Sequence, residues 1–182
     1  MHRASTTVPP DPAVFRDLCG EYATGVTVVT ATSPDGPRAA TVNAFCSLSL
    51  DPPQVIVCLR SSSRTWAAIR QSGCLAVNIL AADQEGLARQ YASADSGKMV
   101  FASFINGLSG IPVIPDSMAT FECEVADSVA SSTHVIVICS VMHAYRQASR
   151  PPLVFFRHRL RRDLPAEAPT AASTGSSPGS GA

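Results

Sequence analysis

Residues 41–53 read Thr41-Val42-Asn43-Ala44-Phe45-Cys46-Ser47-Leu48-Ser49-Leu50-Asp51-Pro52-Pro53, and this stretch decides which fold we expect. Small hydroxyl and amide side chains alternate with apolar ones, which is typical of a strand with one buried face. An apolar strand over residues 55–59 follows, and then the polar run Ser61-Ser62-Ser63-Arg64-Thr65. Serine is a good N-cap, and the amides at a helix start attract anions. Together the two pieces predict a cradle for a phosphorylated ligand.

Before this stretch, the sequence predicts a short helix and a hairpin. Asp11-Pro12 supplies an N-cap and a first-turn proline for a helix that we expect to end near Gly25. A strand over residues 26–30 then leads through the turn Ser33-Pro34-Asp35-Gly36 into a partner strand expected over residues 38–49. The helix is amphipathic, because apolar side chains recur at helical spacing: Val14, Phe15, Leu18 and Tyr22.

After this stretch, the pattern predicts two more helices with a strand between them. One helix begins near Ser63 and ends at Gly73, and a strand over residues 74–80 follows it. Asp83 is a candidate N-cap for the next helix. Residues 92–116 are rich in Ser, Gly and Pro, so we expect a long functional loop there.

The remaining sequence completes a mainly β (α+β) fold. Two long strands are expected over residues 118–129 and 134–145, and a short strand over residues 153–156. Many short strands with few short helices, and no repeating β-α units, predict an antiparallel barrel. The chain has neither G-x-G-x-x-G after a strand nor G-x-x-x-x-G-K-[ST], so a Rossmann or P-loop nucleotide site is disfavoured.

Composition limits the size and the partners of the protein. With 182 residues and 46% hydrophobic content, we expect one domain over residues 11–163, between a disordered lead (1–10) and a disordered tail (164–182). Fourteen basic and fourteen acidic residues balance, which makes nucleic acid an improbable partner. No apolar run reaches the roughly 18 to 20 residues of a membrane span, and residues 1–10 lack the apolar stretch of a secretory signal. We therefore expect a cytoplasmic protein with no membrane contact.

The side chains give little support for metal or hydrolytic chemistry. The six cysteines include no C-x-x-C pair, so thiols are expected to pack as small apolar groups. No G-x-S-x-G nucleophile elbow occurs within the expected domain, residues 11–163. Glu122 and Glu124 alternate in the pattern of an exposed strand face, which leaves no clear acid-base pair. Hydride transfer stays open, because its cofactor carries the chemistry and few catalytic side chains are needed. The histidines are too scattered to form a metal site: His2, His134, His143 and His158.

Four segments carry a family resemblance, in this order: Ala23-Thr24-Gly25-Val26-Thr27-Val28-Val29-Thr30, residues 41–53, Ala76-Val77-Asn78-Ile79-Leu80 and Gly110-Ile111-Pro112-Val113-Ile114. Together they resemble the short-chain NAD(P)H:flavin oxidoreductases, the flavin reductase-like family. The resemblance covers about residues 13 to 160. It implies an FMN-binding split β-barrel, a homodimer, and a role as the reductase component of a two-component flavin-dependent monooxygenase.

The resemblance also implies where the flavin, FAD or FMN, is held. The isoalloxazine ring and ribityl chain would lie along one strand, at Thr41, Val42, Asn43, Ala44 and Phe45. The phosphate would lie at the helix start, at Ser62, Ser63, Arg64 and Thr65. Lys98, the only lysine in the chain, stands in Gly97-Lys98-Met99 where many relatives have Asp-Lys-Phe, and it would add a contact to the same phosphate.

NADH or NADPH would be held by a second set of residues. His134 in Ser132-Thr133-His134 matches the histidine of the family's Gly-Asp-His motif, although the Gly and Asp are absent. The run Phe156-Arg157-His158-Arg159-Leu160 resembles the closing Arg-Gly-x-Tyr segment, with the Gly and Tyr replaced. No side chain is implied as catalytic, because hydride passes directly between nicotinamide and flavin. The implied dinucleotide contacts are Ser47, Leu48, His134, Phe156 and Arg157.

The function implied by the resemblance is reduction of flavin by NADH or NADPH and supply of reduced flavin to a partner monooxygenase. The bias toward arginine, alanine and proline indicates a GC-rich coding background and, with it, a pathway of secondary metabolism. Two alternatives remain. The chain could be a split-barrel oxidase acting on its own substrate, as pyridoxamine phosphate oxidases do, or a flavin-binding or storage protein without turnover.

Overall fold

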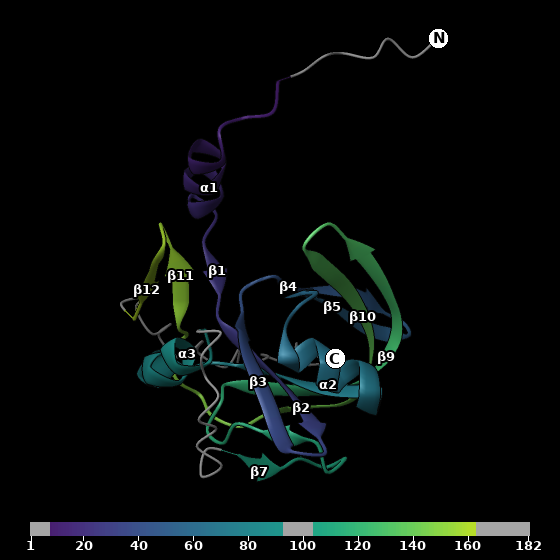
Figure 1. Cartoon of the computed structure of the whole chain (residues 1–182). Coiled ribbons are helices and arrows are strands. Elements are labelled where there is room, and N and C mark those ends of the chain that lie inside the picture. The colour runs from purple at the N-terminus through teal and green to yellow at the C-terminus, as the bar shows by residue number, and fades with distance from the viewer. Residues whose placement is uncertain (1–7, 93–103, 163–182) are drawn as a thin grey trace, which may run out of the picture.

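The computed structural model describes residues 8–92 and 104–162. Most strands belong to one seven-stranded sheet with the order β3-β2-β6-β9-β10-β5-β4, in which every neighbouring pair is antiparallel (Figure 1). This confirms the mainly β, antiparallel fold expected from the sequence. Its strands are β2 (Thr27–Ser33), β3 (Gly36–Val42), β4 (Phe45–Leu50), β5 (Pro53–Arg60), β6 (Cys74–Ile79), β9 (Ala119–Ser131) and β10 (His134–Arg146).

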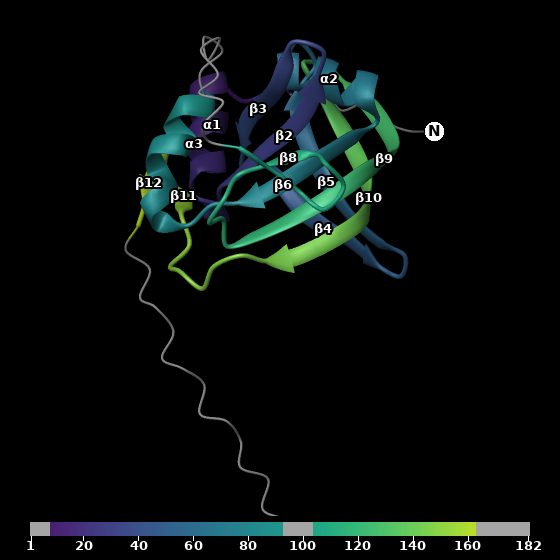
Figure 2. The same ribbon diagram turned by 90° about the horizontal axis from the view of Figure 1, so that it is seen from below.

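The two edge strands of this sheet, β3 and β4, are consecutive in the chain. Only residues 43 and 44 separate them, and the Cys58 N–H donates to the Ala44 carbonyl at 3.0 Å as β4 begins to pair with β5. The expectation of one strand over residues 38–49 is therefore wrong. The alternating pattern continues through the break, and it cannot reveal that the chain leaves β2 and takes β5 as its new partner. Because the edges are joined so closely, the twisted sheet curls into a split barrel (Figure 2).

The barrel interior is filled by alternate apolar residues of the strands, and α2 (Arg64–Ser72) packs against β2. The expected limits of α2 are confirmed by its caps. Ser63 Oγ accepts from the Trp66 N–H at 3.0 Å, and Gly73 adopts a left-handed φ of 73°. A second apolar cluster lies where α3 (Glu85–Ala92) meets a small sheet. The strands of this sheet are β1 (Thr24–Gly25), β11 (Val154–Phe156) and β12 (Arg159–Arg161).

The first helix, α1 (Pro12–Gly20), begins as expected but ends early. Asp11 Oδ1 accepts from Ala13 N at 2.8 Å, which confirms the N-cap. The helix was expected to reach Gly25, but β1 (Thr24–Gly25) pairs instead with β11 (Val154–Phe156). In Figure 1 α1 projects beyond the small sheet, and Leu18 remains 66% exposed. The apolar face of this helix is thus uncovered in the single chain.

Three further local expectations need correction. Asp83 does not cap α3, because it lies inside a short 3₁₀ turn (Ala82–Gln84) where Gln84 Oε1 accepts from Ala81 N at 3.0 Å. The segment expected as loop contains two short paired strands, β7 (Ile105–Asn106) and β8 (Pro112–Val113). A final strand that the sequence did not predict, β12 (Arg159–Arg161), pairs with β11.

Glu122 is fully buried, so its expected place on an exposed face is wrong. Its carboxylate accepts from the backbone N–H groups of Leu108 and Ser109, both at 2.7 Å, and from the Tyr145 hydroxyl at 2.9 Å. Burial raises the pKa of Glu122, but these donors outweigh burial and leave the pKa below its usual value. The loop that joins β7 to β8 is therefore fastened to β9 through an ionised carboxylate.

Among the described residues, no helix is long and apolar enough to cross a bilayer.

Candidate functional site

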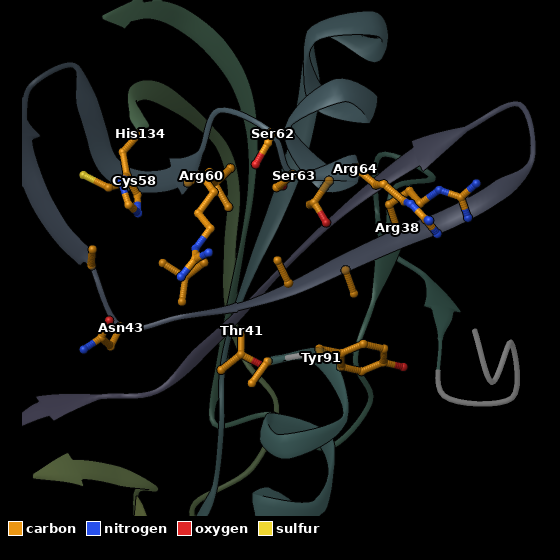
Figure 3. A pocket seen from close by; sticks show the side chains of 17 residues that line it. Arg38, Thr41, Asn43, Cys58, Arg60, Ser62, Ser63, Arg64, Tyr91 and His134 are labelled. Atoms are coloured by element: carbon orange, nitrogen blue, oxygen red, sulfur yellow. The ribbon is translucent and has the colours of Figure 1, made fainter. Parts of the chain in front are cut away.

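A cavity of about 640 Å³ lies between β3, the end of β5 and the start of α2 (Figure 3). It runs along the edge strand β3 and the two residues, 43 and 44, that lead into β4. The residues that line it are Arg38, Ala39, Ala40, Thr41, Val42, Asn43, Ala44, Cys58, Leu59, Arg60, Ser62, Ser63, Arg64, Thr65, Tyr91, Ala92 and His134.

The strand side of the cavity contains four of the five residues expected to face the flavin ring: Thr41, Val42, Asn43 and Ala44. The Thr41 hydroxyl donates to the Ala88 carbonyl at 2.6 Å, which fixes α3 against β3. The Val42 carbonyl accepts from the Thr27 hydroxyl at 2.7 Å. These contacts join the edge strand to β2 and α3 on this side of the cavity.

The helix side contains all four residues expected at the phosphate: Ser62, Ser63, Arg64 and Thr65. The Ser63 hydroxyl is occupied by its capping bond to Trp66 N. The first-turn amides of an α-helix have no intrahelical acceptor, and the helix dipole favours an anion beside them. The start of α2 therefore presents donors and positive potential to the cavity.

Two cations in the cavity, Arg38 and Arg60, were not singled out from the sequence. Figure 3 shows the Arg60 side chain directed from the end of β5 into the cavity. Arg38 Nη2 lies 3.2 Å from Asp35 Oδ2. The described residues that line the cavity include three arginines and no acidic residue, so this part of the lining is positively charged. The available signal for Arg60 was its position directly before the serine-rich turn.

His134 also lines the cavity, at the first residue of β10 and in register with Arg60 of β5. Its Nδ1 lies 2.9 Å from the Thr133 hydroxyl. Thr133 thus occupies the position before the histidine, where the family motif has Asp, and supplies a neutral contact to the ring. The structure brings His134 to the same cavity as the expected flavin residues.

The other expected contacts lie elsewhere. Phe45 is partly buried and packs against the core beside Phe121, with ring centroids 5.8 Å apart. Arg157 forms an ion pair with Glu21 at 2.9 Å, which raises the pKa of its guanidinium, and stacks over Phe156. Lys98 lies outside the described residues. Four expected dinucleotide contacts do not line the cavity: Ser47, Leu48, Phe156 and Arg157.

Among the described residues that line the cavity, the one thiol, Cys58, is not activated as a nucleophile. Burial raises the pKa of the Cys58 thiol, and the neighbouring Cys46 raises it further. A protonated thiol is a poor nucleophile. Within residues 8–92 and 104–162, no three His, Cys, Asp or Glu side chains come together as a metal site.

The donor set fits a flavin nucleotide. One part of the cavity combines the start of α2 with Arg64, which suits a phosphate. The other end is a strand of small and apolar residues around Asn43, which suits a flat ring whose edge requires hydrogen-bond partners.

A model of the flavin reductase-like domain matches residues 19–162. The chain belongs to the flavin reductase-like family. The family expected from the sequence is thereby confirmed.

Three proteins illustrate the similarity. A Rhizobium meliloti protein described as "Probable flavin reductase" is 39% identical over 70% of this chain, which spans only 42% of that longer relative. The reductase component of 4-nitrophenol 4-monooxygenase/4-nitrocatechol 2-monooxygenase from Rhodococcus opacus is 35% identical, over 86% of this chain and 84% of the relative. The structure of the Streptomyces globisporus NADH:FAD oxidoreductase SgcE6 with NAD and FAD fragments has a TM-score of 0.80 and 31% identity, covering 90% of this chain and all of that chain.

Proposed function

We propose that this protein is an NADH- or NADPH-dependent flavin reductase that reduces FAD or FMN and supplies reduced flavin to a separate monooxygenase component. The observation that carries the proposal is the cavity between β3 and α2 in a chain of the flavin reductase-like family. The Rhodococcus relative is itself the reductase component of a monooxygenase. Such a role places the protein in the cytoplasm, where nicotinamide dinucleotides are reduced.

When bound, the flavin supplies the chemistry by accepting hydride from the reduced nicotinamide. The protein's own task is binding and orientation. Asn43 and the backbone around it would contact the ring edge, while Arg64 and the start of α2 would hold the phosphate. His134 would contact the nicotinamide side of the site. None of these residues needs to exchange a proton for hydride transfer to occur.

An anaerobic turnover experiment tests this proposal. The purified protein is mixed with NADH, or NADPH, and a large excess of FAD or FMN, and flavin absorbance is followed. A reductase bleaches many equivalents of flavin per protein. Bleaching of one equivalent or none would contradict the proposal, and would favour an oxidase with its own substrate or a flavin-binding protein without turnover.

The phosphate assignment is tested by Arg64→Ala, with Arg70→Ala as the matched control. Both residues are exposed on α2, but only Arg64 lines the cavity. We expect Arg64→Ala to raise the Kd for FMN about tenfold and to leave the Kd for riboflavin, which has no phosphate, unchanged. Equal loss for both ligands would place Arg64 away from the phosphate.

The protein is further proposed to be a homodimer. The uncovered face of α1 supports this, since Phe15 and Leu18 are both more than half exposed. Light scattering coupled to size exclusion should give a dimer mass for the wild type and a monomer mass for Leu18→Asp. If the Leu18→Asp protein is still a dimer, α1 does not lie in the dimer interface.

A further inference from the structure

The turn that precedes His134 is fastened to the residue that leads into the proposed phosphate site. Ser132 and Thr133 form this turn, between the end of β9 and the start of β10. The Thr133 carbonyl accepts two hydrogen bonds from Ser61, one from the backbone N–H at 3.0 Å and one from the hydroxyl at 3.1 Å. Through Ser61, the position of His134 is therefore tied to the start of the phosphate site.

The conformation of the turn is unfavourable for one of its residues. Ser132 has a φ of 51°, and it is the one of the two turn residues with a positive φ. Hairpin turns of this pattern favour glycine at their first central position. The family motif has Gly-Asp-His here, so the chain keeps the turn although serine replaces the glycine. Backbone strain of this kind persists where a position is functional, and the position it preserves here is that of His134.

The imidazole of His134 is exposed at the cavity and is oriented by Thr133. Its Nδ1 lies 2.9 Å from the Thr133 hydroxyl, and this is the one side-chain hydrogen bond of His134 within residues 8–92 and 104–162. Nε2 is therefore the ring nitrogen left to contact a ligand. Figure 3 shows His134 beside Arg60 at the cavity, in agreement with the register of β10 and β5.

The hydroxyl of Thr133 engages the ring without adding charge. It can donate to Nδ1 or accept from it, so it suits either tautomer of a neutral imidazole. The aspartate that the family motif has at this position would bring a negative charge close to Arg60 and to the proposed phosphate site. Threonine thus keeps this side of the cavity positive while it still holds Nδ1.

We propose that Thr133 and Ser61 are positioning residues: Thr133 orients the imidazole of His134 toward the reduced nicotinamide, and Ser61 holds Thr133 in place. This inference rests on the proposed function, because it takes His134 as a contact of the nicotinamide. It adds two residues that are not among the expected contacts, and both act through His134 and not on the ligand.

A double-mutant cycle between Thr133→Val and His134→Ala tests the inference. The ligand is tetrahydro-NAD, a reduced nicotinamide analogue that does not transfer hydride, and calorimetry gives its Kd for the protein saturated with FMN. Thr133→Val, which removes the hydroxyl but keeps the shape, should raise this Kd about threefold. Thr133→Ser should restore it. In the His134→Ala background, Thr133→Val should change nothing.

Two further variants separate the roles within the hairpin. Ser61→Ala removes only the hydroxyl bond to the Thr133 carbonyl and keeps the backbone bond, so it should raise the Kd in the same direction by a smaller factor. Ser131→Ala is the control, because it removes a hydroxyl from the same hairpin outside the cavity lining. It should leave the Kd for tetrahydro-NAD unchanged.

Nitrogen-15 NMR of the imidazole gives a readout that does not depend on ligand binding. The signals of His134 are identified by their loss in His134→Ala. They should shift in Thr133→Val, return in Thr133→Ser and stay in place in Ser131→Ala. A residue that served the fold alone would not give this pattern.

Three results would overturn the inference. One is an unchanged Kd for tetrahydro-NAD in Thr133→Val, and another is an unchanged imidazole spectrum in that variant. The third is an equal rise in Kd with and without His134, because the hydroxyl would then act on the ligand or on the fold. Wild-type turnover tests the proposed function separately, because neither the calorimetric Kd nor the NMR spectrum depends on flavin reduction.

Discussion

The Tyr145 hydroxyl donates to Glu122 Oε1 at 2.9 Å, and through this bond β10 helps to hold the carboxylate that fastens the loop between β7 and β8. Glu122→Gln should lower the free energy of unfolding by about 2 to 3 kcal/mol, because an amide offers one acceptor where two backbone N–H groups and a hydroxyl require partners. Tyr145→Phe should cost only about 1 kcal/mol. Urea unfolding measures both. Glu124→Gln is the control, because Glu124 is an exposed residue on the same strand. If it lowered the free energy of unfolding equally, the buried hydrogen bonds of Glu122 would not explain the effect.

The same pair predicts how stability depends on pH. The pKa of Glu122 is lowered in the folded protein, so its contribution is present above the unfolded value of about 4.3 and is lost as pH falls through the folded pKa. The difference in unfolding free energy between wild type and Glu122→Gln should therefore shrink in acid. A constant difference down to pH 2 would contradict this.

At alkaline pH, the dependence of stability on pH comes from Tyr145. Burial and the bond to Glu122 raise the pKa of its hydroxyl to about 12. Because an unfolded tyrosine titrates near 10, the contribution is complete below about pH 10 and is lost as pH rises toward 12. Tyr145→Phe should lack this loss in urea unfolding across that range. If both proteins lose stability equally there, another group is responsible.

A structural feature could be predicted from the sequence when the residues that determine it lie close together in the chain. The limits of α2 are local, since Ser63 and Gly73 act on amides and carbonyls within four residues, and they are confirmed. The burial of Glu122 depends on a loop that precedes it by more than ten residues, and alternation along β9 carries no signal for that contact. The break at residues 43 and 44 likewise depends on which strand β4 chooses as a partner.

Two glycines provide opposite tests of packing. An added Cβ at Gly107 would lie 2.5 Å from Glu122 Oε1, and three hydrogen bonds prevent that carboxylate from moving away. Gly107→Ala should therefore cost about 1 to 3 kcal/mol. At Gly86, in α3, a Cβ meets nothing within 4 Å, so Gly86→Ala should stabilise the protein by up to about 1 kcal/mol through helix propensity. Thermal unfolding shows whether each variant is more or less stable than the wild type. A stabilised Gly107→Ala protein would contradict the claim that the Glu122 carboxylate is held in place.

Arg60 offers the sharpest test of the cavity, because only its place before the serine-rich turn marked it in the sequence. It extends into the cavity from β5 and makes no ion pair within the described residues. If its guanidinium contacts the flavin phosphate, Arg60→Ala should weaken FMN about tenfold in fluorescence titrations at low salt, and the loss should shrink as added salt screens the contact. Riboflavin should bind both proteins equally, since it has no phosphate. If Arg60→Ala weakened riboflavin binding as much as FMN binding, Arg60 would contact the ring and not the phosphate.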